Sequence, residues 1–509
     1  MRARKLTAGS LATLLLTLIL AGGALAGYED IEGEVQEIVL DNGLKILLLE
    51  RHEVPVFSFW TYVNVGGADE VTNLTGLAHM FEHMAFKGTQ TVGTFDYKKE
   101  AKLFEKMDAV YLELRDERWK GENADADRIA ELEAEFTELQ EQANELVDAN
   151  AFGRVVESNG GVGMNAMTSA DATQYFYSMP SNKLEVWAAL ESDRYTNPVL
   201  REFYKERNVI VEERRMRTES NPQGRLFEEF LALAYLGHSY GQPTIGHRSD
   251  IEAYSRIDAY EFYERHYGAK NMVIAVVGDV YYDELKKLAE KYFSDIPPGN
   301  GGVHVRTVDP QQLGERRVVL EDPAQPFLMI GYHIPDARHE DMPAVSALAD
   351  ILGQGRSSRL YSSLVKESQT SLFTGCFAGL PGDRYPSLLI ALGVPNAGVD
   401  IQDMEQDIYD EIELIKSEGV TAEELAGYKN RARAEFIQGL RGMMGMSGNI
   451  AIAAQLCYAE MVLGDWRELF RALDDIEAVT LEDVQRVANE YLVKSNRSVG
   501  MIVTENQDS

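Results

Sequence analysis

The two halves of the chain are related by an internal repeat, which limits the folds available to it. Residues 257–277 read as a helix followed by a strand, and residues 482–503 align with them without a gap at an offset of 225. Nearer the start of each half, residues 57–60 (FSFW) resemble residues 327–330 (FLMI), at an offset of 270. Chance recurrence of helix–strand patterns is the alternative. The gapless match favours two copies of one α/β domain.

The first copy carries an insertion. The two offsets differ by 45 residues, which is close to the length of a segment at about 96–150 with a helical pattern. Apolar residues in this segment recur every three or four positions on both sides of a turn at 121–127. This spacing predicts a helical hairpin with a coiled-coil-like seam. We expect it to be a structural arm.

The repeat and the insertion together predict the fold class. We expect an α+β fold of two homologous α/β sandwich domains, each an antiparallel-rich sheet covered by helices, with the helical hairpin inserted in the first. The first domain would span residues 27–298 and the second residues 303–509. Between them, residues 297–302 (PPGNGG) have the composition of a linker.

Residues 1–26 have the pattern of a secretory signal. Basic residues at the start precede an apolar run at 11–21, and Ala24 and Ala26 form a small-x-small cleavage site. An uncleaved anchor helix is the alternative, but the apolar run is short for a membrane span. We expect cleavage after Ala26, a periplasmic or secreted protein, and no stable membrane anchor.

The chain is strongly acidic and contains two cysteines. It has 49 basic and 82 acidic side chains, for a net charge of −33, which argues against nucleic acid as the main partner. Cys376 and Cys457 are too few for a disulfide framework or a cysteine-type zinc site. They either pair with each other or stay buried as free thiols.

One helix carries a motif with metal-binding spacing. His79 and His83 are four residues apart, so they lie on one helix face and could bind a single zinc ion. Glu82 borders that face, where a carboxylate can deprotonate a water without being a ligand. This H-x-x-E-H order is that of the inverted zincins. The alternative is two structural histidines that are satisfied by hydrogen bonds within a core helix.

A second helix, at 203–217, offers a third ligand. Glu206 and Glu213 are seven residues apart and share a face with apolar side chains. Carboxylates in such a place are costly unless they are paired or bind a metal. Glu212 is rotated off this face and is the poorer candidate. The alternative is ion pairing with the arginines of the same helix, at positions 207, 214 and 217.

Five segments carry a resemblance to a known family. They are residues 79–89 (HMFEHMAFKGT), 165–169 (NAMTS), 191–194 (ESDR), 206–213 (ERNVIVEE) and 353–360 (GQGRSSRL). In these segments the chain resembles the pitrilysin/insulinase family of inverzincin metallopeptidases, which includes the mitochondrial processing peptidases. His83 and Glu213 are 130 residues apart here, against roughly seventy to eighty in the usual family motif, and the inserted hairpin accounts for the difference.

The resemblance assigns roles to residues of both helices. It implies that His79, His83 and Glu213 bind zinc. It makes Glu82 the general base, and it makes Glu206 a second acidic group that supports the site. The second half has no H-x-x-E-H motif, so the resemblance implies one zinc ion per chain.

The same resemblance implies how a substrate is held and how chains assemble. Asn165 and Ala166 match the edge strand that pairs with the substrate backbone in the family. An extended peptide gains main-chain hydrogen bonds when it adds to a sheet edge. Members of the family form a chamber of four such domains, which implies a homodimer or a heterodimer with a related subunit.

These inferences predict a zinc metalloendopeptidase that hydrolyses peptides or unfolded polypeptides. Zinc would polarise the scissile carbonyl and activate a water, and Glu82 would take the water's proton and pass it to the leaving amine. Two alternatives stay open. One is a non-catalytic family member that acts as a structural or partner subunit, against which the intact motif argues. The other is a zinc hydrolase of non-peptide substrates.

Overall fold

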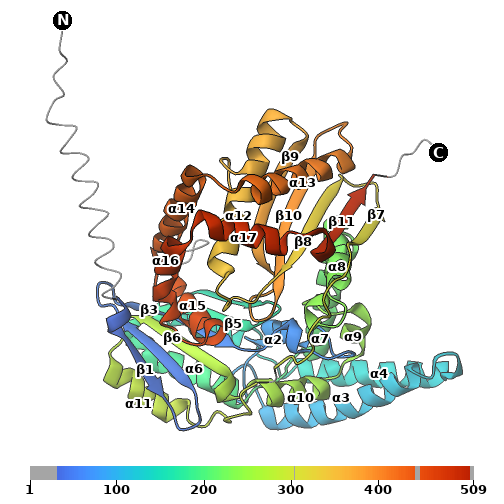
Figure 1. The fold of residues 1–509 in the computed structure, drawn as a ribbon. Coiled ribbons are helices and arrows are strands. Elements are labelled where there is room, and N and C mark those ends of the chain that lie inside the picture. The colour runs from blue at the N-terminus through green and yellow to red at the C-terminus, as the bar shows by residue number, and fades with distance from the viewer. Residues whose placement is uncertain (1–30, 303, 442–447, 505–509) are drawn as a thin grey trace, which may run out of the picture.

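Two β-sheets, one from each half of the chain, form the framework of the protein (Figure 1). The structure is a computed structural model, and it describes residues 31–302, 304–441 and 448–504. The predicted secretory signal at 1–26 and its cleavage site lie outside the described residues. The predicted linker at 297–302 contains no helix or strand.

The first sheet has six strands in the order β1-β2-β6-β3-β5-β4. β2 and β6 are parallel, and the other neighbours are antiparallel. Between β1 and β2, Gly43 takes the left-handed conformation, with φ of 92°, which a tight hairpin turn requires. The strands are β1 (Val35–Val39), β2 (Lys45–Glu50), β3 (Val56–Val63), β4 (Val162–Thr168), β5 (Thr173–Pro180) and β6 (Met272–Gly278).

The second sheet repeats this order without β1, as β7-β11-β8-β10-β9. The helix and strand that end each half have identical spacing, because α10 (Arg256–His266) and β6 lie 225 residues before α17 (Leu481–Tyr491) and β11. The predicted α+β class with two homologous domains is confirmed. The strands are β7 (Arg316–Glu321), β8 (Phe327–Ile334), β9 (Ser371–Leu380), β10 (Ser387–Pro395) and β11 (Arg497–Val503).

The offset at the start of the two halves is 269, and the predicted value of 270 is wrong. Phe59 lies opposite Val276 in the first sheet, and Leu328 lies opposite Met501 in the second. Since Val276 and Met501 are 225 residues apart, Phe59 corresponds to Leu328. A shift of one residue moves a strand side chain to the other face of its sheet. Residues 327–330 are all apolar, and the one polar side chain in residues 57–60, that of Ser58, is buried, so these residues cannot show which face is which.

Helices cover one face of each sheet. The first sheet shares its main core with α2 (Leu77–Met84), α6 (Leu184–Thr196), α10 and α11 (Tyr282–Tyr292). The second sheet shares its core with α12 (Met342–Gly353), α13 (Ile401–Glu418) and α17. Each domain is therefore a sheet with a helical layer, as the repeat predicted.

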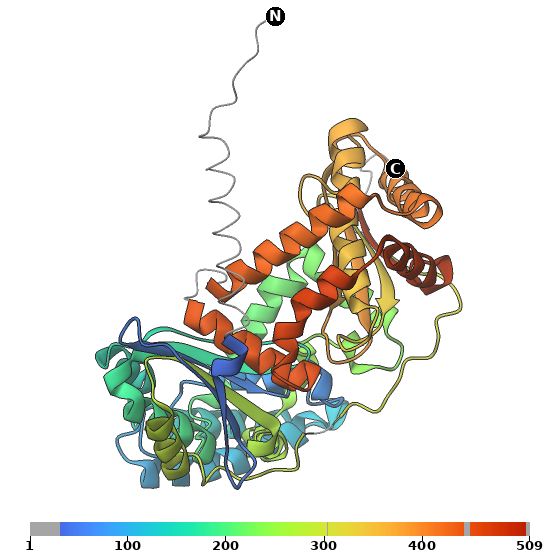
Figure 2. The same cartoon turned by 60° about the vertical axis from the view of Figure 1, so that its left-hand side comes forward.

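The opposite faces are covered by helices that the two halves exchange (Figure 2). α8 (Pro222–Ala234) belongs to the first half but packs on the second sheet, whereas α15 (Gly448–Tyr458) belongs to the second half but packs on the first. An offset of 225 carries α8 onto residues 447–459, so the exchanged helices are equivalent members of the repeat. Neither half buries both faces of its sheet alone. The boundaries 27–298 and 303–509 stay a prediction.

The remaining helices lie around these layers. They are α3 (Tyr97–Arg118), α4 (Ala126–Asn144), α5 (Ala151–Ser158), α7 (Phe203–Arg214), α9 (Arg248–Ala253), α14 (Ala422–Arg441) and α16 (Glu468–Ala478). Among residues 31–302, 304–441 and 448–504, no helix combines the length and the apolar character that crossing a membrane requires.

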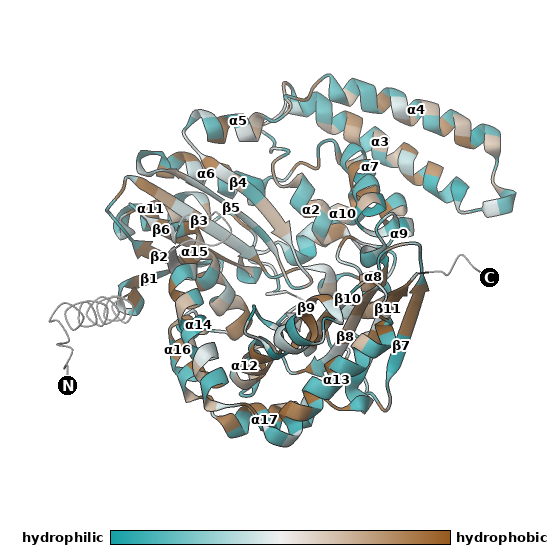
Figure 3. Ribbon diagram, turned by 90° about the horizontal axis from the view of Figure 1, so that it is seen from above, coloured by the Kyte–Doolittle hydropathy of each residue, from teal (hydrophilic) through white to brown (hydrophobic). Residues whose placement is uncertain are grey.

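The predicted helical hairpin consists of α3 and α4 and projects from the first half (Figure 3). About midway along it, Tyr111 of α3 and Phe136 of α4 pack against Tyr204 of α7, with ring centroids 4.6 and 5.0 Å from that of Tyr204. Arg207 of α7 also donates a hydrogen bond to the Tyr111 hydroxyl. The hairpin therefore supports α7, the helix that carries Glu206 and Glu213.

The two cysteines are buried free thiols, so they do not pair with each other. Cys376 lies in β9, and Cys457 lies in α15 with its sulfur 3.3 Å from the Trp60 carbonyl oxygen. Burial raises the pKa of both thiols, and the thiolate is the reactive form. We expect neither to react with Ellman's reagent in the native protein and both to react after unfolding. A thiol that reacts within minutes in the native protein would contradict this burial.

Candidate metal centre

Helix α2 is held by contacts at its first residues and along its apolar face. Gly76 precedes the helix in the left-handed conformation, with φ of 91°. The buried carboxylate of Glu70 accepts hydrogen bonds of 2.7 Å from the backbone N–H groups of Gly76 and Ala78, which have no partner inside the helix. The side chains of one face are buried in the core; they are Leu77, Met80, Phe81 and Met84. His79 and His83 lie on the side that faces α7.

Helix α7 presents two of its three acidic residues to α2. Phe203 and Ile210 are buried and anchor the helix in the core. Glu206 and Glu213, which the sequence places on one face, both approach His83, at 3.5 and 3.2 Å. Arg217, just after the helix, also binds Glu213, at 2.8 Å. The predicted alternative of arginine pairing therefore applies to Glu213 in addition to the histidine contacts.

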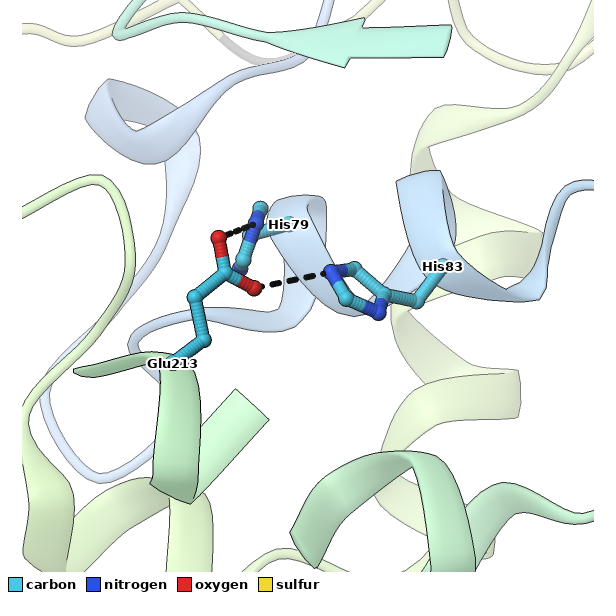
Figure 4. A group of neighbouring side chains, drawn as sticks. All are labelled: His79, His83 and Glu213. Carbon is cyan, nitrogen blue, oxygen red and sulfur yellow. Dashed lines mark ion pairs between the residues drawn. The ribbon is translucent and has the colours of Figure 1, made fainter. Parts of the chain in front are cut away.

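His79, His83 and Glu213 form a compact cluster (Figure 4). One potential ligand atom from each residue lies within 4.8 Å of the others, and this is the one such cluster of three within the described parts of the chain. Nε2 of His79 is 3.8 Å from one carboxylate oxygen of Glu213, and Nε2 of His83 is 3.2 Å from the other. The structure thus brings together all three residues that were predicted to bind the metal.

The surroundings of the two histidines differ. Burial, with the nearby charges of His83 and Arg217, lowers the pKa of His79 to about 3, so its imidazole is neutral and keeps a lone pair for a metal. Burial also opposes protonation of His83, but the carboxylates of Glu206, Glu213 and Glu82 outweigh it and raise its pKa. A cation at this position would replace the proton that His83 otherwise attracts.

Glu82 lies in the same cavity as His79 but outside the ligand cluster. The cavity has a volume of about 440 Å³ and is also lined by Thr168 and Arg217. Burial raises the pKa of the Glu82 carboxyl, and the charge of Glu213 adds to this effect, whereas His83 opposes it. A carboxyl group with a raised pKa is suited to accept and return a proton near neutral pH.

Glu206 lies behind His83 on the side away from Glu213. Its carboxylate is 3.5 Å from Nδ1 of His83 and accepts a hydrogen bond of 2.5 Å from Lys87. Burial opposes ionisation of Glu206, but His83 and Lys87 outweigh it and lower its pKa. Glu206 is therefore a charged group beside the ring of His83, and its supporting role stays a prediction.

The strand predicted to bind substrate is the edge strand of the first sheet. β4 pairs with β5 on one side only. Asn165 is exposed and Ala166 is buried, and the backbone N–H of Ala166 donates a hydrogen bond of 2.9 Å to the Asn165 side chain. Thr168, at the end of β4, lines the cavity beside His79 and Glu82. The strand therefore leads directly to the candidate metal centre.

Several residues at the site could not be found by sequence reasoning. Glu70 caps α2 from six residues before Gly76, a distance that matches no capping motif. The sequence pattern indicates Arg217 only as a partner of the acidic residues, whereas the structure places it in the cavity wall. Leu380 and Pro381 line the cavity although they come from the second half of the chain. None of the residues that line the cavity comes from the α3–α4 hairpin.

Two family models match the chain. The model described as insulinase (peptidase family M16) matches residues 45–109 and 142–248, and the model described as peptidase M16 inactive domain matches residues 254–432. The chain belongs to peptidase family M16. The gap in the first M16 match, at 110–141, falls within the α3–α4 hairpin, which supports its interpretation as an insertion.

Relatives of this M16 chain are named as proteases. Zinc protease PqqE of Helicobacter pylori is 26% identical over 494 residues, which cover 95% of each chain. The crystal structure of a protease from Helicobacter pylori superimposes with a TM-score of 0.73 at 25% identity, over 92% of this chain and 99% of that one. The periplasmic protease PqqL of Escherichia coli shares the fold, with a TM-score of 0.68 at 17% identity over 93% of this chain. The two proteins from Helicobacter pylori support a peptidase-like function.

Proposed function

We propose that this M16 chain is a zinc-dependent endopeptidase that acts on peptides or unfolded polypeptides in the periplasm or outside the cell. The observation that carries the proposal is the cluster of His79, His83 and Glu213, with the Glu82 carboxyl in the adjoining cavity. Two imidazoles and one carboxylate form a typical donor set for catalytic zinc, which keeps a further position open. The names of the relatives also support zinc as the metal.

The residues present fit a zinc ion. Ligand atoms that share a tetrahedral zinc at bond lengths of about 2.0–2.2 Å lie roughly 3–4 Å apart. The contacts of Glu213 with the two histidines, made through different carboxylate oxygens at 3.8 and 3.2 Å, are in this range, and one ligand atom from each residue lies within 4.8 Å of the others. The neutral imidazole of His79 is in the protonation state that metal binding requires.

The chain's own residues account for the other parts of peptide hydrolysis. When bound, zinc would supply a Lewis acid that polarises a peptide carbonyl and promotes ionisation of a water. The free edge of β4 would hold an extended substrate beside the centre through main-chain hydrogen bonds. The Glu82 carboxylate would take a proton from the attacking water and return it to the departing amine.

The test of this function is a digest of a library of unstructured peptides by the purified protein, analysed by mass spectrometry. We expect cleavage that a zinc chelator abolishes and that added zinc restores, with about one zinc ion per chain by elemental analysis. Cleavage that survives complete removal of the metal would overturn the proposal. If the protein cleaves only non-peptide substrates, the result would favour the alternative of a zinc hydrolase that acts on such substrates.

A second candidate function is that of a non-catalytic partner subunit. Residues 254–432 match a model described as an inactive domain, and the part of the chain that this model covers contains no H-x-x-E-H motif. A protein that binds zinc stoichiometrically but cleaves no peptide, alone or after chelation and reloading, would favour this alternative over the peptidase.

We also propose that the chain works as a dimer, either with itself or with a related subunit. It covers 48% of the length of PqqL, so two copies of this chain would match that protein in length. Light scattering coupled to gel filtration should give twice the monomer mass, or should do so once a related subunit is added. A monomer with full peptidase activity would refute the proposal.

Glu206 provides a further prediction about the metal. Replacing Glu206 by Ala should lower zinc affinity by about 10- to 100-fold, because His83 loses the carboxylate that holds its ring. Competition with a zinc-binding dye measures this change. The matched control is Glu212→Ala, since Glu212 is exposed and binds Arg215 on the outer side of the same helix. Equal zinc affinities of the two variants would show that Glu206 has no such role.

A further inference from the structure

The equivalent hairpins of the two halves meet next to the candidate metal centre. In the first half, the turn between β4 and β5 contains Asp171; in the second, residues 380–386, here termed the Arg384 loop, join β9 to β10. The Asp171 carboxylate accepts backbone hydrogen bonds from Asp383 and Arg384, at 2.6 and 3.1 Å. A Cβ atom at Gly382 would lie 2.4 Å from the same carboxylate, so the loop approaches as closely as a glycine permits.

The side chain of Arg384 enters the first half. Its guanidinium donates to Asp69 at 2.7 Å and to the Asn64 side chain at 2.7 Å, and both side chains of the ion pair are more than nine-tenths buried. Removing one partner of such a pair leaves an uncompensated buried charge, so the loop is held firmly in this position.

The contact of Arg384 continues to the metal-binding helix. Asp69, which binds Arg384, also accepts a hydrogen bond of 2.9 Å from the backbone N–H of Gly66. The next residue, Glu70, caps the start of α2 through the N–H groups of Gly76 and Ala78. One short segment therefore connects the second half of the chain to the helix that carries His79.

The Arg384 loop also completes the cavity at the candidate metal centre. Leu380 and Pro381 lie in its wall, together with Phe227 and Leu231 of the exchanged helix α8 and Ile245. His79 and Glu82 lie in the same cavity. The cavity thus has a polar side, where peptide hydrolysis would occur, and an apolar side. The apolar side is provided largely by elements that lie against the second sheet. A volume of about 440 Å³ is large enough for a side chain of a bound peptide.

We propose that the Arg384 loop determines specificity: Leu380 and Pro381 form the apolar wall of a subsite for a large apolar side chain next to the scissile bond, and Arg384 holds this wall in place. The inference rests on the proposed peptidase function. It makes Leu380 a residue that touches substrate and Arg384 a positioning residue that acts through Leu380 and Asp69. The preferred substrates are peptides with Phe, Leu or a similar residue beside the cleaved bond.

The test compares two peptides that differ only beside the bond that the wild-type protein cleaves, where one carries Phe and the other Ala. Leu380→Ala and Arg384→Gln should each lower the ratio of kcat/KM for the Phe peptide to that for the Ala peptide by about tenfold, with unchanged zinc content. Arg384→Lys should recover part of the ratio, because it keeps the charge but not the two-pronged geometry. Fluorescence anisotropy of labelled peptides measures the corresponding ratio of the Kd values of the Phe and Ala peptides.

Matched controls separate recognition from general damage. Leu372→Ala removes an exposed leucine from the same strand, β9, outside the cavity. Arg497→Gln removes another arginine of the second half that is paired with a carboxylate, that of Glu315, away from the centre. Both should keep the wild-type ratio. An unchanged ratio in Leu380→Ala, or an equal loss on both peptides in Arg384→Gln, would overturn the inference.

Different results would contradict the proposed peptidase function and the proposed subsite. If the wild-type protein binds the peptides but cleaves neither, the proposed function is wrong, and the Kd ratios alone decide the role of the Arg384 loop. If it binds neither peptide, the subsite does not exist and the inference falls as well. If cleavage is normal but the Phe peptide has no advantage in the wild-type protein, only the inference is overturned.

Discussion

Replacing Glu82 by Gln is expected to lower kcat/KM for a peptide by about 10²- to 10⁴-fold, the usual contribution of a general base. Glutamine preserves the shape of the side chain but cannot accept a proton. Zinc should remain bound, because Glu82 lies outside the cluster of His79, His83 and Glu213. Steady-state kinetics and elemental analysis of the same preparation measure the two effects separately.

The informative comparison for Glu82→Gln is Glu212→Gln. This second variant makes the same chemical change on α7, at an exposed carboxylate that binds Arg215. It should have wild-type kinetics. If Glu82→Gln retained normal cleavage, another group would have to be the base. If it lost zinc as well as activity, Glu82 would instead be part of the metal site.

The candidate site was largely predictable because most of its residues are paired by their spacing along one helix. His79 and His83 share a helix face at any position in any fold, and so do Glu206 and Glu213. Spacing alone could not show that the two faces meet, since 130 residues and an inserted hairpin separate His83 from Glu213. The family resemblance supplied that step, and the cluster in the structure agrees with it.

The arrangement of the two halves was less predictable. The gapless repeat indicated two equivalent domains, but α8 and α15 carry apolar residues that would fit either sheet. Only the three-dimensional arrangement shows that the helices are exchanged. For the same reason a strand offset of 270 could not be distinguished from 269, although the difference moves each side chain of the strand to the other face of its sheet.

The contacts between the two halves of the chain could not be predicted from the sequence. Asp69, Asp171 and Arg384 stand in loop-like segments where charged residues normally face water. In the structure all three are buried, because the equivalent hairpins of the two halves meet there. Sequence patterns report which face of an element is apolar, but they do not report which loops become buried when two domains associate.

A buried arginine near the metal helix leads to the second large prediction. Arg201 and Glu100, both almost completely buried, form a two-pronged ion pair at 2.6 and 2.9 Å. Arg201 also donates to the backbone carbonyls of Lys87, Thr89 and Val92, which follow α2. It therefore joins the segment after His83, the start of the hairpin helix α3 and the residues before α7.

Replacing Arg201 by Ala should lower the free energy of unfolding by about 3–5 kcal/mol, because the Glu100 carboxylate and the carbonyl groups would be left buried without a partner. Zinc affinity should fall too, since the substitution loosens the connection between the helices that carry His83 and Glu213. Denaturant unfolding and a zinc-binding dye measure these effects.

The control variant Arg118→Ala removes an exposed ion pair with Glu133 on the hairpin that carries Glu100. It should lower the free energy of unfolding by no more than about 1 kcal/mol. The double variant Arg201→Met, Glu100→Leu should regain part of the lost stability, because no charge is then left buried alone. Equal stabilities of Arg201→Ala and Arg118→Ala would mean that the hairpin is not anchored through this pair.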